Sequence, residues 1–294
     1  MVGQKRIREN ITSLLKCDSL PPHILLIGGA GEGKTHLAKE IYKMAKAKYE
    51  GELILVHITR GESLKKPEVL QAELCRCGAS PTVFFLDEIH NLSPRCVEAL
   101  YAPMDEGELQ VYTRRAYTLL LPPLMIIGAT TDPGLIPRPL LSRFTVLFME
   151  PYTTEEIADI LVEKKMRKDA AITLAQRSRN NPRLALQHLG KIKRIVPIKD
   201  ITEDIVVKVM DDWDIDAFGL RSLDWDYLLY LSHIGRASIA SISTVLGVDS
   251  NYIANEIEPY LVKVGFISKE TSGRSLTPLG VQFISKEARS GYIL

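Results

Sequence analysis

The sequence has no long apolar run and no recognisable disulfide framework. Its 294 residues hold no apolar segment near the roughly 20 residues that a membrane-spanning helix needs. The first residues, MVGQKRIREN, lack the apolar core of a secretory signal peptide. The four cysteines, at positions 17, 75, 77 and 96, are too few and too irregularly spaced for a secreted disulfide scaffold. These absences predict a cytoplasmic protein.

An excess of charge of one sign is also missing from the chain as a whole. The formal net charge is +1, yet residues 151–199 carry 11 Lys and Arg against 5 Asp and Glu, and residues 220–294 carry 7 against 7. A basic middle segment is typical of two arrangements, a face that contacts nucleic acid and a solvated helical face. Composition alone leaves both open.

Short apolar runs alternate with helical patterns over the first half of the chain. The runs HILLIG, LILVHI, TVFFLD and LMIIGAT have strand length and are bounded by turns or charges. Continuous apolar runs of this kind are typical of strands covered on both faces, as in a parallel sheet. With 46% apolar residues, the chain can fill such cores. An α/β domain is therefore predicted for residues 1–150.

Two smaller units are predicted after Pro151. Residues 151–213 read as several helices, the first of which is opened by Thr153 and Glu156 in capping-box spacing. Residues 214–294 read as three helices followed by two short strands around KETSGRSL. That order of elements indicates a winged helix, so the chain is predicted to have three parts.

The stretch GGAGEGKT matches the phosphate-loop pattern G-x-x-x-x-G-K-[ST] between a predicted strand and a predicted helix. Its glycines let backbone N–H groups point at phosphate oxygens, and the helix adds the positive end of its dipole. Lys34 is expected on the β- and γ-phosphates and Thr35 on Mg²⁺. The predicted ATP-binding residues are Gly28, Gly29, Ala30, Gly31, Glu32, Gly33, Lys34, Thr35 and His36.

The stretch VFFLDEIH supplies two acids at the end of a buried run. Asp87 is expected to complete the Mg²⁺ shell with Thr35. Glu88 is expected to act as the general base, because only an acceptor can take the proton of the attacking water. His90, one turn further on, is interpreted as a packing histidine.

Five stretches resemble, in order and spacing, the RuvB family of AAA+ ATPases, which drive branch migration of Holliday junctions in bacteria. They are DEIH, IGATT, PLLSRF, SRNNPR and EPYLVKVGFISKETSGRSLTPLG. The likeness runs from GQKRIRENI to about Ile284. It implies an AAA+ domain with a parallel sheet, a small helical lid domain and a C-terminal winged helix.

The resemblance also implies further catalytic residues. Thr131 matches the polar residue that orients the attacking water, and Arg143 matches the arginine finger inserted into a neighbouring subunit's site. Arg183 matches the lid arginine that reaches the γ-phosphate. Each position has a simpler alternative: Thr131 capping a strand, Arg143 as a surface arginine, and Arg183 capping a helix.

Binding residues follow from the same resemblance. Gly3 and Gln4 match the segment beside the adenine, and Arg274 matches the wing arginine directed at DNA, with a solvated turn arginine as the alternative. Two stretches depart from the family. In the family, a segment that lines the adenine pocket precedes the GQ pair, whereas this chain starts at that pair. The family's adenine affinity and selectivity are therefore not carried over to this chain. The hairpin that docks on the partner RuvA in the family here has the shorter, basic tip 113–116.

Three functions are compatible with these motifs. The first is a ring motor, a hexamer by resemblance, that couples ATP hydrolysis to movement of duplex or four-way-junction DNA, with a RuvA-like or different partner on the altered hairpin. The second is a loader or switch ATPase that assembles a helicase or another protein on DNA. The third is a DNA-binding regulator with residual ATPase activity. The full set of nucleotide-site residues favours the motor.

Overall fold

A computed structural model shows two compact units. One is Met1–Glu156 together with Asn181–Arg183, and the other is Ile157–Asn180 together with Leu184–Leu294. Among the described helices, none combines the length and apolar character needed to cross a membrane. The division of the chain into three parts, with boundaries at residues 150 and 213, stays a prediction. The structure describes residues 2–16, 22–48, 53–58, 65–76, 79–112 and 116–289.

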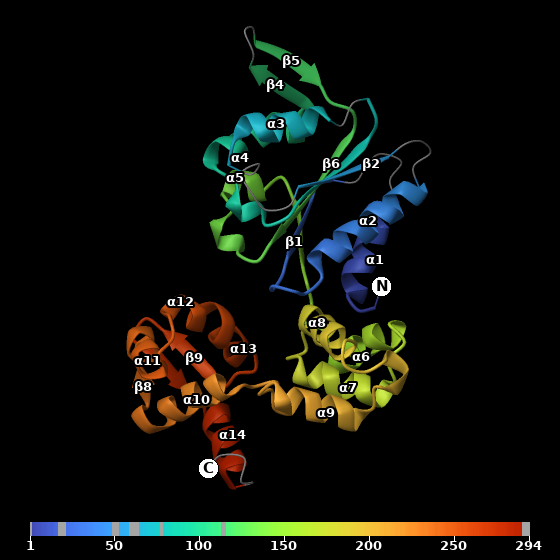
Figure 1. Ribbon diagram of the computed structural model, residues 1–294. Coiled ribbons are helices and arrows are strands. Elements are labelled where there is room, and N and C mark those ends of the chain that lie inside the picture. The colour runs from blue at the N-terminus through green and yellow to red at the C-terminus, as the bar shows by residue number, and fades with distance from the viewer. Residues whose placement is uncertain are drawn as a thin grey trace. The chain divides into compact units, whose positions relative to one another are not determined.

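The first unit is built on a five-stranded parallel sheet (Figure 1). Four strands coincide with the apolar runs quoted above, so the predicted parallel α/β sheet is confirmed, and a fifth strand goes beyond the prediction. Across the sheet the strands are β2 (Ile54–Ile58), β3 (Thr82–Leu86), β6 (Leu124–Thr130), β1 (Ile24–Ile27) and β7 (Thr145–Phe148).

Helices cover both faces of this sheet, because successive strand residues point to opposite sides. Leu26 and Phe85 pack with α1 (Lys5–Leu14) and α2 (Lys34–Lys48). Leu25 and Phe84 pack on the other face, with α3 (Pro67–Cys75) and α4 (Pro94–Asp105). Short helices complete the unit: η2 (Ile89–Asn91), η3 (Pro133–Leu135) and α5 (Arg138–Leu141).

The carboxyl ends of three neighbouring strands meet at one edge of the sheet. Ile27 lies beside Thr130, and Leu86 beside Gly128, in the parallel register. The loops that follow β1, β3 and β6 therefore start side by side. Such an edge is where ligands bind in open α/β sheets.

A two-stranded hairpin extends from the first unit (Figure 1). Strands β4 (Glu108–Tyr112) and β5 (Ala116–Leu120) pair antiparallel, as the alternating pattern predicts. Leu109 is buried in the core below α4, whereas Tyr117 and Leu120 are exposed. The predicted basic tip, Thr113 to Arg115, lies outside the described residues.

The segment after the sheet is helical, as predicted. The Thr153–Glu156 capping box is confirmed: the Glu156 N–H donates to Thr153 Oγ1 (3.2 Å), and the Thr153 N–H donates to Glu156 Oε2 (3.0 Å). The helices that follow lie together in Figure 1. They are α6 (Thr154–Glu163), α7 (Lys168–Arg177), α8 (Pro182–Ile192), η4 (Ile198–Asp200) and α9 (Glu203–Asp212).

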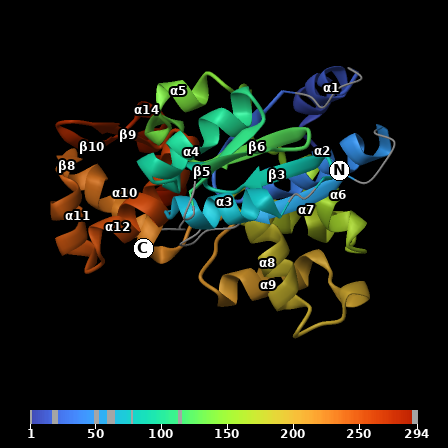
Figure 2. The ribbon, with the colours of Figure 1, turned by 90° about the horizontal axis from the view of Figure 1, so that it is seen from above.

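The last part is a winged helix with its own core, seen from above in Figure 2. Tyr227, Leu228 and Leu261 are buried at its centre. Its strand order is β8–β10–β9. The elements are α10 (Ser222–Ile234), β8 (Arg236–Ala237), α11 (Ile239–Leu246), α12 (Ser250–Tyr252), η5 (Ile253–Ile257), α13 (Glu258–Lys263), β9 (Ile267–Glu270), β10 (Gly273–Leu276) and α14 (Pro278–Arg289).

The third helix of this unit differs from its prediction as one continuous helix. A π-helical turn at Ile253–Ile257 interrupts it between α12 and α13. Pro259 lies two residues after this turn and lacks the N–H that a regular α-helix would use there. The strand β8 and the final helix α14 also go beyond the prediction.

Candidate functional site

The loop 28–33 joins β1 to the first turn of α2. Gly31 and Gly33 have φ of 82° and 86°, a conformation that side-chain-bearing residues rarely adopt. A Cβ on Gly28 would come within 2.6 Å of Met149 Cβ, and one on Gly31 within 2.5 Å of Asn181 Oδ1. Glycine is therefore required at Gly28 by this close contact, and at Gly31 also by the backbone conformation.

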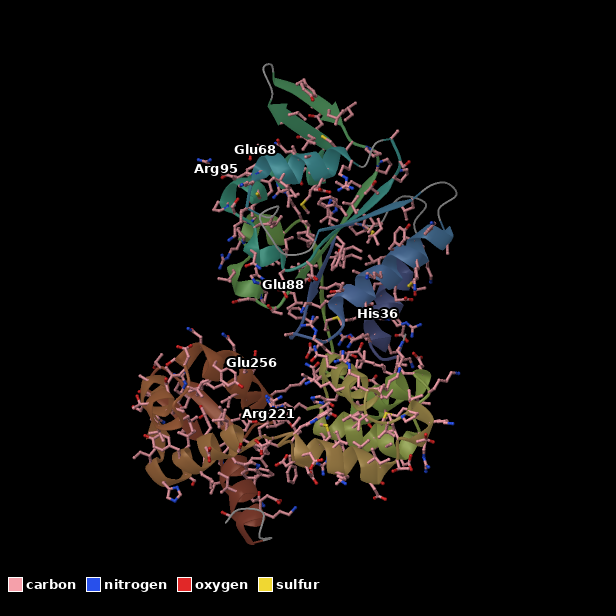
Figure 3. The ribbon with its side chains drawn as sticks, viewed as in Figure 1. His36, Glu68, Glu88, Arg95, Arg221 and Glu256 are labelled. Carbon is pink, nitrogen blue, oxygen red and sulfur yellow. The ribbon has the colours of Figure 1, made fainter. Side chains whose placement is uncertain are left out.

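This loop binds an anionic oxygen in the structure itself. The Gly29 N–H donates to Glu32 Oε2 at 2.7 Å. The bound atom is a carboxylate oxygen, which presents the same kind of acceptor as a phosphate oxygen. The donor set of the loop therefore fits a polyphosphate. Ala30 and His36 are exposed at the loop and at the start of α2 (Figure 3).

Lys34 folds back over the loop. Its Nζ donates to the carbonyls of Gly28 (2.9 Å) and Gly29 (3.0 Å), and the residue is 6% exposed. Burial lowers the pKa of Lys34, and nearby carboxylates, first Glu88 and then Asp87, oppose that shift. The ammonium of Lys34 thus lies near these carboxylates and beside the loop that would bind the negatively charged phosphates.

Thr35, in the first turn of α2, meets Asp87, which follows β3. The Thr35 hydroxyl donates to Asp87 Oδ2 at 3.1 Å. A hydroxyl and a carboxylate at the phosphate loop are oxygen ligands of the type that Mg²⁺ prefers. The pair fits the metal site predicted from the sequence. Among the described residues, no group of three or more His, Cys, Asp and Glu side chains forms a separate metal site.

Glu88 stands at the end of β3 with φ of 53° and is 7% exposed (Figure 3). The Thr131 hydroxyl donates to its Oε2 at 3.2 Å. Two residues predicted separately, as a base and as a water-orienting group, are therefore in contact. A carboxylate in this position can accept a proton from a molecule bound beside it.

His90 is a member of this cluster that the sequence reasoning assigned to packing. Its Nδ1 lies 2.9 Å from Thr130 Oγ1 and 3.4 Å from Glu88 Oε2. Thr130 in turn accepts a hydrogen bond from the Asp132 N–H at 3.0 Å. The imidazole thus links the end of β6 to the carboxylate of Glu88. The signal in the sequence was its position two residues after that acid.

Arg183 lies close to the phosphate loop, as the resemblance implies. Its charge contributes to lowering the pKa of Lys34, after burial. Its N–H donates to Asn181 Oδ1 at 3.0 Å, and the Asn181 amide donates to the Ala30 carbonyl at 2.9 Å. Asn181 therefore fastens the start of α8 to the loop, a role that the sequence reasoning did not assign.

Arg143 follows α5. Within the described part of the chain, its hydrogen bonds and its ring contact involve none of the other predicted catalytic residues. Its Nε donates to both oxygens of Asp105, at 2.8 and 3.0 Å, and Nη1 donates to the Pro139 carbonyl at 2.6 Å. The guanidinium lies over the Tyr101 ring, 4.3 Å from its centroid. The hydrogen bond from Arg143 lowers the pKa of Asp105. The arginine is held on its own surface, which suits a group used by a neighbouring subunit.

Gly3 and Gln4 contact the chain where it leaves the sheet. The Gln4 amide donates to the Glu150 carbonyl (2.6 Å) and accepts from the Glu150 N–H (2.9 Å). A Cβ on Gly3 would come within 2.7 Å of the Tyr152 ring. The side chain of Gln4 thus fixes the N-terminal segment, and a contact with adenine stays a prediction.

Arg274 lies inside the wing, paired with a buried carboxylate. Its Nε donates to Glu258 Oε1 at 2.7 Å, and Lys269 Nζ lies 2.6 Å from Glu258 Oε2. Glu258 is 0% exposed. Burial raises its pKa, but the two cations outweigh burial and lower it overall. The structure therefore gives Arg274 a structural partner, and its DNA contact stays a prediction.

Comparison with known proteins decides the family. The family model "Holliday junction DNA helicase RuvB P-loop domain" matches residues 1–149, and the "RuvB C-terminal winged helix domain" matches residues 217–285. The chain belongs to the RuvB family. A RuvB from Wolbachia sp. subsp. Brugia malayi is 35% identical over 96% of this chain and 90% of its own length. RuvB of Fervidobacterium nodosum is 31% identical over 99% and 88%.

Solved RuvB structures have the same fold. The Thermotoga maritima "RuvB Holliday junction branch migration motor" superposes with a TM-score of 0.77, at 27% identity, over 97% of this chain and 95% of that one. Cdc6p from Pyrobaculum aerophilum reaches a TM-score of 0.52 at 16% identity, a likeness of fold alone. The resemblance to RuvB and the predicted fold class are confirmed.

Proposed function

We propose that this protein is a RuvB-like motor that couples ATP hydrolysis to movement of duplex DNA and to branch migration of Holliday junctions in recombination and repair. Its relatives carry the name "Holliday junction branch migration complex subunit RuvB". One observation carries the proposal for this chain. The contacts Thr35–Asp87 and Thr131–Glu88 meet beside Lys34 at one sheet edge, in a chain that also holds a winged helix.

ATP is the proposed nucleotide. The backbone N–H groups of residues 28–33 bind its phosphates, and Lys34 compensates the charge of the β- and γ-phosphates. Thr35 and Asp87 would hold Mg²⁺, which would supply charge compensation on the phosphate oxygens. These contacts involve only the phosphates and Mg²⁺, so selectivity for adenine depends on other residues.

Glu88 acts as the general base of hydrolysis in this proposal. Its carboxylate accepts the proton of the attacking water, while the Thr131 hydroxyl orients the acceptor. Arg183 reaches the γ-phosphate from the start of α8, next to the loop contact of Asn181. Together these residues stabilise the developing charge without forming a covalent bond to the phosphate.

A ring of subunits, six by family resemblance, completes the site in this proposal. Arg143 is held by Asp105 on the surface of its own subunit and would act on the nucleotide of a neighbour. The wing and Arg274 would contact the DNA phosphates, and β4–β5 would receive a RuvA-like or different DNA-bound partner. Because bacterial DNA lies in the cytoplasm, we place the protein there.

Branch migration of a synthetic four-way junction tests the proposal. The wild type with ATP and Mg²⁺ is expected to convert the junction to duplex products, alone or with a RuvA-like protein. Glu88→Gln is expected to bind ATP and lose turnover by about 10²–10⁴-fold, because an amide cannot accept the proton. Junction binding and ATP turnover without any migration would instead favour the loader function.

A further inference from the structure

His23 stands directly before β1 and has no part in the mechanism described above. Its side chain is half-buried and contacts three segments that are far apart in the sequence. They are the end of α4, the beginning of β6 and the residue that follows Arg143. Two of these contacts adjoin the two members of the Arg143–Asp105 ion pair, one member each.

The hydrogen bonds of His23 define which ring nitrogen carries the proton. The Ile126 N–H donates to Nδ1 at 2.9 Å, so Nδ1 is an acceptor. A neutral imidazole has one acceptor and one donor nitrogen, so the proton lies on Nε2. Nε2 lies 3.2 Å from the Met104 carbonyl and donates to it. Burial lowers the pKa of His23 and favours this neutral ring, while the Met104 bond and the charge of Asp105 oppose that shift.

The bond to Met104 fixes the end of the helix on which Arg143 rests. Met104 is the last residue but one of α4, and the last carbonyls of an α-helix lack a partner within the helix. His23 supplies a partner for this carbonyl. The next residue, Asp105, accepts from Arg143 Nε at 2.8 and 3.0 Å, and Tyr101 of the same helix lies under the guanidinium. The imidazole therefore holds the turn of α4 that receives the arginine.

The same residue also holds the chain that carries Arg143. Phe144 follows the arginine directly and is 8% exposed. Its ring meets the imidazole edge-on, with 6.2 Å between the centroids and 66° between the planes, which is a favourable arrangement of two rings. The Thr145 N–H donates to the His23 carbonyl at 2.8 Å. The segment after the arginine is thus fastened to the start of β1.

We propose that His23 is the positioning residue for Arg143. Through Met104 it fixes the acceptor side of the ion pair, and through Phe144 it fixes the donor side. Without these two contacts the pair can still form, but its position relative to the sheet is set less closely. A displacement of about 1 Å at a reacting centre lowers a rate by about 10²-fold. The inference rests on the proposed function, since it requires Arg143 to act on the nucleotide of a neighbouring subunit.

The contact of His23 with β6 has a different effect and must be kept separate. His23 precedes β1, which leads to the phosphate loop, and its bond with Ile126 supports that strand. Loss of this bond would disturb the subunit's own nucleotide site. His23→Asn separates the two effects. The amide oxygen of asparagine can replace Nδ1 as the acceptor, but its shorter side chain does not reach Met104 and has no ring to meet Phe144.

Mixed rings show which subunit carries the defect. His23→Asn alone should hydrolyse saturating ATP about 10- to 100-fold more slowly than the wild type, with KM for ATP nearly unchanged. Its subunits keep a working site but offer a displaced arginine. Lys34→Ala subunits lack a site and offer an intact arginine, so a mixture of the two should regain activity. A mixture of His23→Asn with Arg143→Ala should regain none, because neither variant offers a well-placed arginine.

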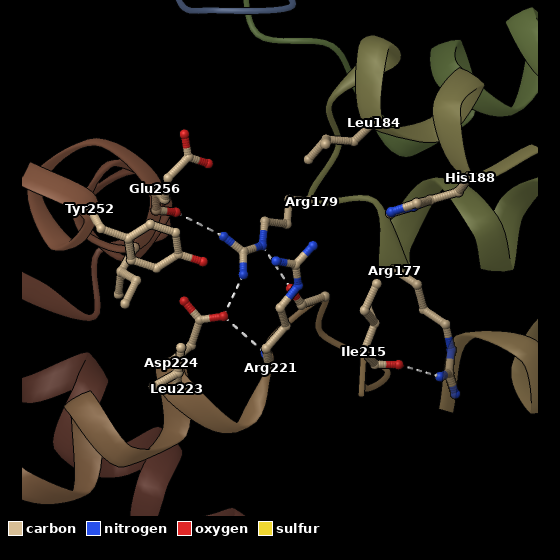
Figure 4. A pocket seen from close by; sticks show the side chains of 12 residues that line it. Arg177, Arg179, Leu184, His188, Ile215, Arg221, Leu223, Asp224, Tyr252 and Glu256 are labelled. Atoms are coloured by element: carbon tan, nitrogen blue, oxygen red, sulfur yellow. Dashed lines mark hydrogen bonds and ion pairs between the residues drawn. The ribbon is translucent and has the colours of Figure 1, made fainter. Parts of the chain in front are cut away.

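His188→Asn is the matched control for the loss of a histidine from the interior. His188 is 5% exposed and lines a pocket in the second unit (Figure 4). The same substitution there should retain wild-type turnover at pH 7 without any added subunit. If His23→Asn does not fold, Phe144→Leu decides. Leucine keeps an apolar group at this buried position and removes the ring that meets the imidazole, so the two mixtures should differ in the same way.

The outcomes separate this inference from the proposed function. Recovery of His23→Asn by Lys34→Ala but not by Arg143→Ala supports it. If Arg143→Ala and Lys34→Ala restore each other, three results for His23→Asn overturn the inference alone: wild-type turnover, no recovery with Lys34→Ala, or equal recovery with both partners. If Arg143→Ala and Lys34→Ala assemble into mixed rings and do not restore each other, the ring mechanism of the proposed function fails, and the inference fails with it.

Discussion

Arg143 and Asp105 form a two-pronged ion pair between the turn after α5 and the end of α4. Nε bonds both carboxylate oxygens at 2.8 and 3.0 Å, and Nη2 bonds Oδ2 at 2.5 Å. Arginine's planar fork matches this carboxylate geometry, which a lysine could not reproduce. These contacts fix the orientation of the guanidinium on the surface of its own chain.

Arg143→Ala is expected to bind ATP and hydrolyse almost none, because an arginine supplied across a subunit boundary contributes about 10³–10⁵ to turnover. Phosphate release under saturating ATP measures this. Arg138→Ala, which removes an exposed arginine on α5, is the matched control and should retain wild-type turnover.

Mixing variants tests whether Arg143 acts on a neighbour. Lys34→Ala subunits lack a working site but still offer the arginine, and Arg143→Ala subunits have the reverse defect. Mixed rings should recover part of the activity that neither variant has alone. Mixed rings that assemble and remain inactive would show that Arg143 does not act between subunits.

His90→Ala should lower kcat by about tenfold and leave KM for ATP nearly unchanged. The imidazole contacts Thr130 and Glu88 but lies outside the phosphate loop, so its loss disturbs the base in the transition state more than ATP binding. His90→Asn keeps a donor near the position of Nδ1 and should regain part of the rate. Equal loss in both variants, with a raised KM, would contradict this role.

Arg274→Ala should destabilise the winged helix as well as weaken DNA binding. The substitution removes one of the cations that pair with fully buried Glu258. Loss of a partner from a buried polar group costs about 1–3 kcal/mol. Urea unfolding monitored by tryptophan fluorescence measures this, because Trp225 belongs to the same unit. Weakened DNA binding at unchanged stability would show that Glu258 does not need Arg274.

Mild acid should destabilise the second unit through His188. This residue is 5% exposed, its Nδ1 lies 3.0 Å from Ser178 Oγ, and burial followed by Lys191, Arg221 and Arg179 lowers its pKa from 6.5 to about 4. Between these two values the unfolded chain binds a proton that the folded chain does not. Stability is therefore lost as the pH falls from 6.5 towards 4, by about 2 to 3 kcal/mol.

His188→Asn provides the comparison for this pH effect. An asparagine can keep a hydrogen bond with Ser178 and does not titrate. Urea midpoints of the wild type and the variant at pH 7, 6 and 5 should diverge as the pH falls, with the wild type losing more. Parallel curves would assign the acid sensitivity to other groups.

The fold was predictable wherever the spacing of apolar residues and the position of turn-forming residues indicate the same element. The four apolar runs became four neighbouring parallel strands, and three of them, β1, β3 and β6, are buried on both faces. The strand β7 is harder to predict, since Phe148 is exposed and Thr145 and Val146 are only half-buried. Pro259 indicates an interruption of the third helix, but the sequence pattern does not specify the π-helical turn at Ile253–Ile257 that precedes it.

The candidate site was predictable where the spacing of a sequence motif indicates which ligand its residues bind. The spacing of the phosphate loop and the acid pair led to Lys34, Thr35, Asp87 and Glu88, and these lie at one sheet edge. The supporting residues were not predictable in the same way. Asp105 and Asn181 act through contacts between segments far apart in the sequence, and the residues next to them in the sequence do not indicate the partner.

The strand order also governs how this protein is made. The phosphate-loop strand β1 lies between β6 and β7, so Ile24 pairs only with Ile127 and Thr145. While the ribosome is still synthesising the first half, β1 has two open edges and an apolar surface on each face. Such a segment is prone to aggregate until distant strands arrive. Nascent chains that stop before residue 124 should therefore require a chaperone, and ATP binding should appear only after residue 148 has emerged.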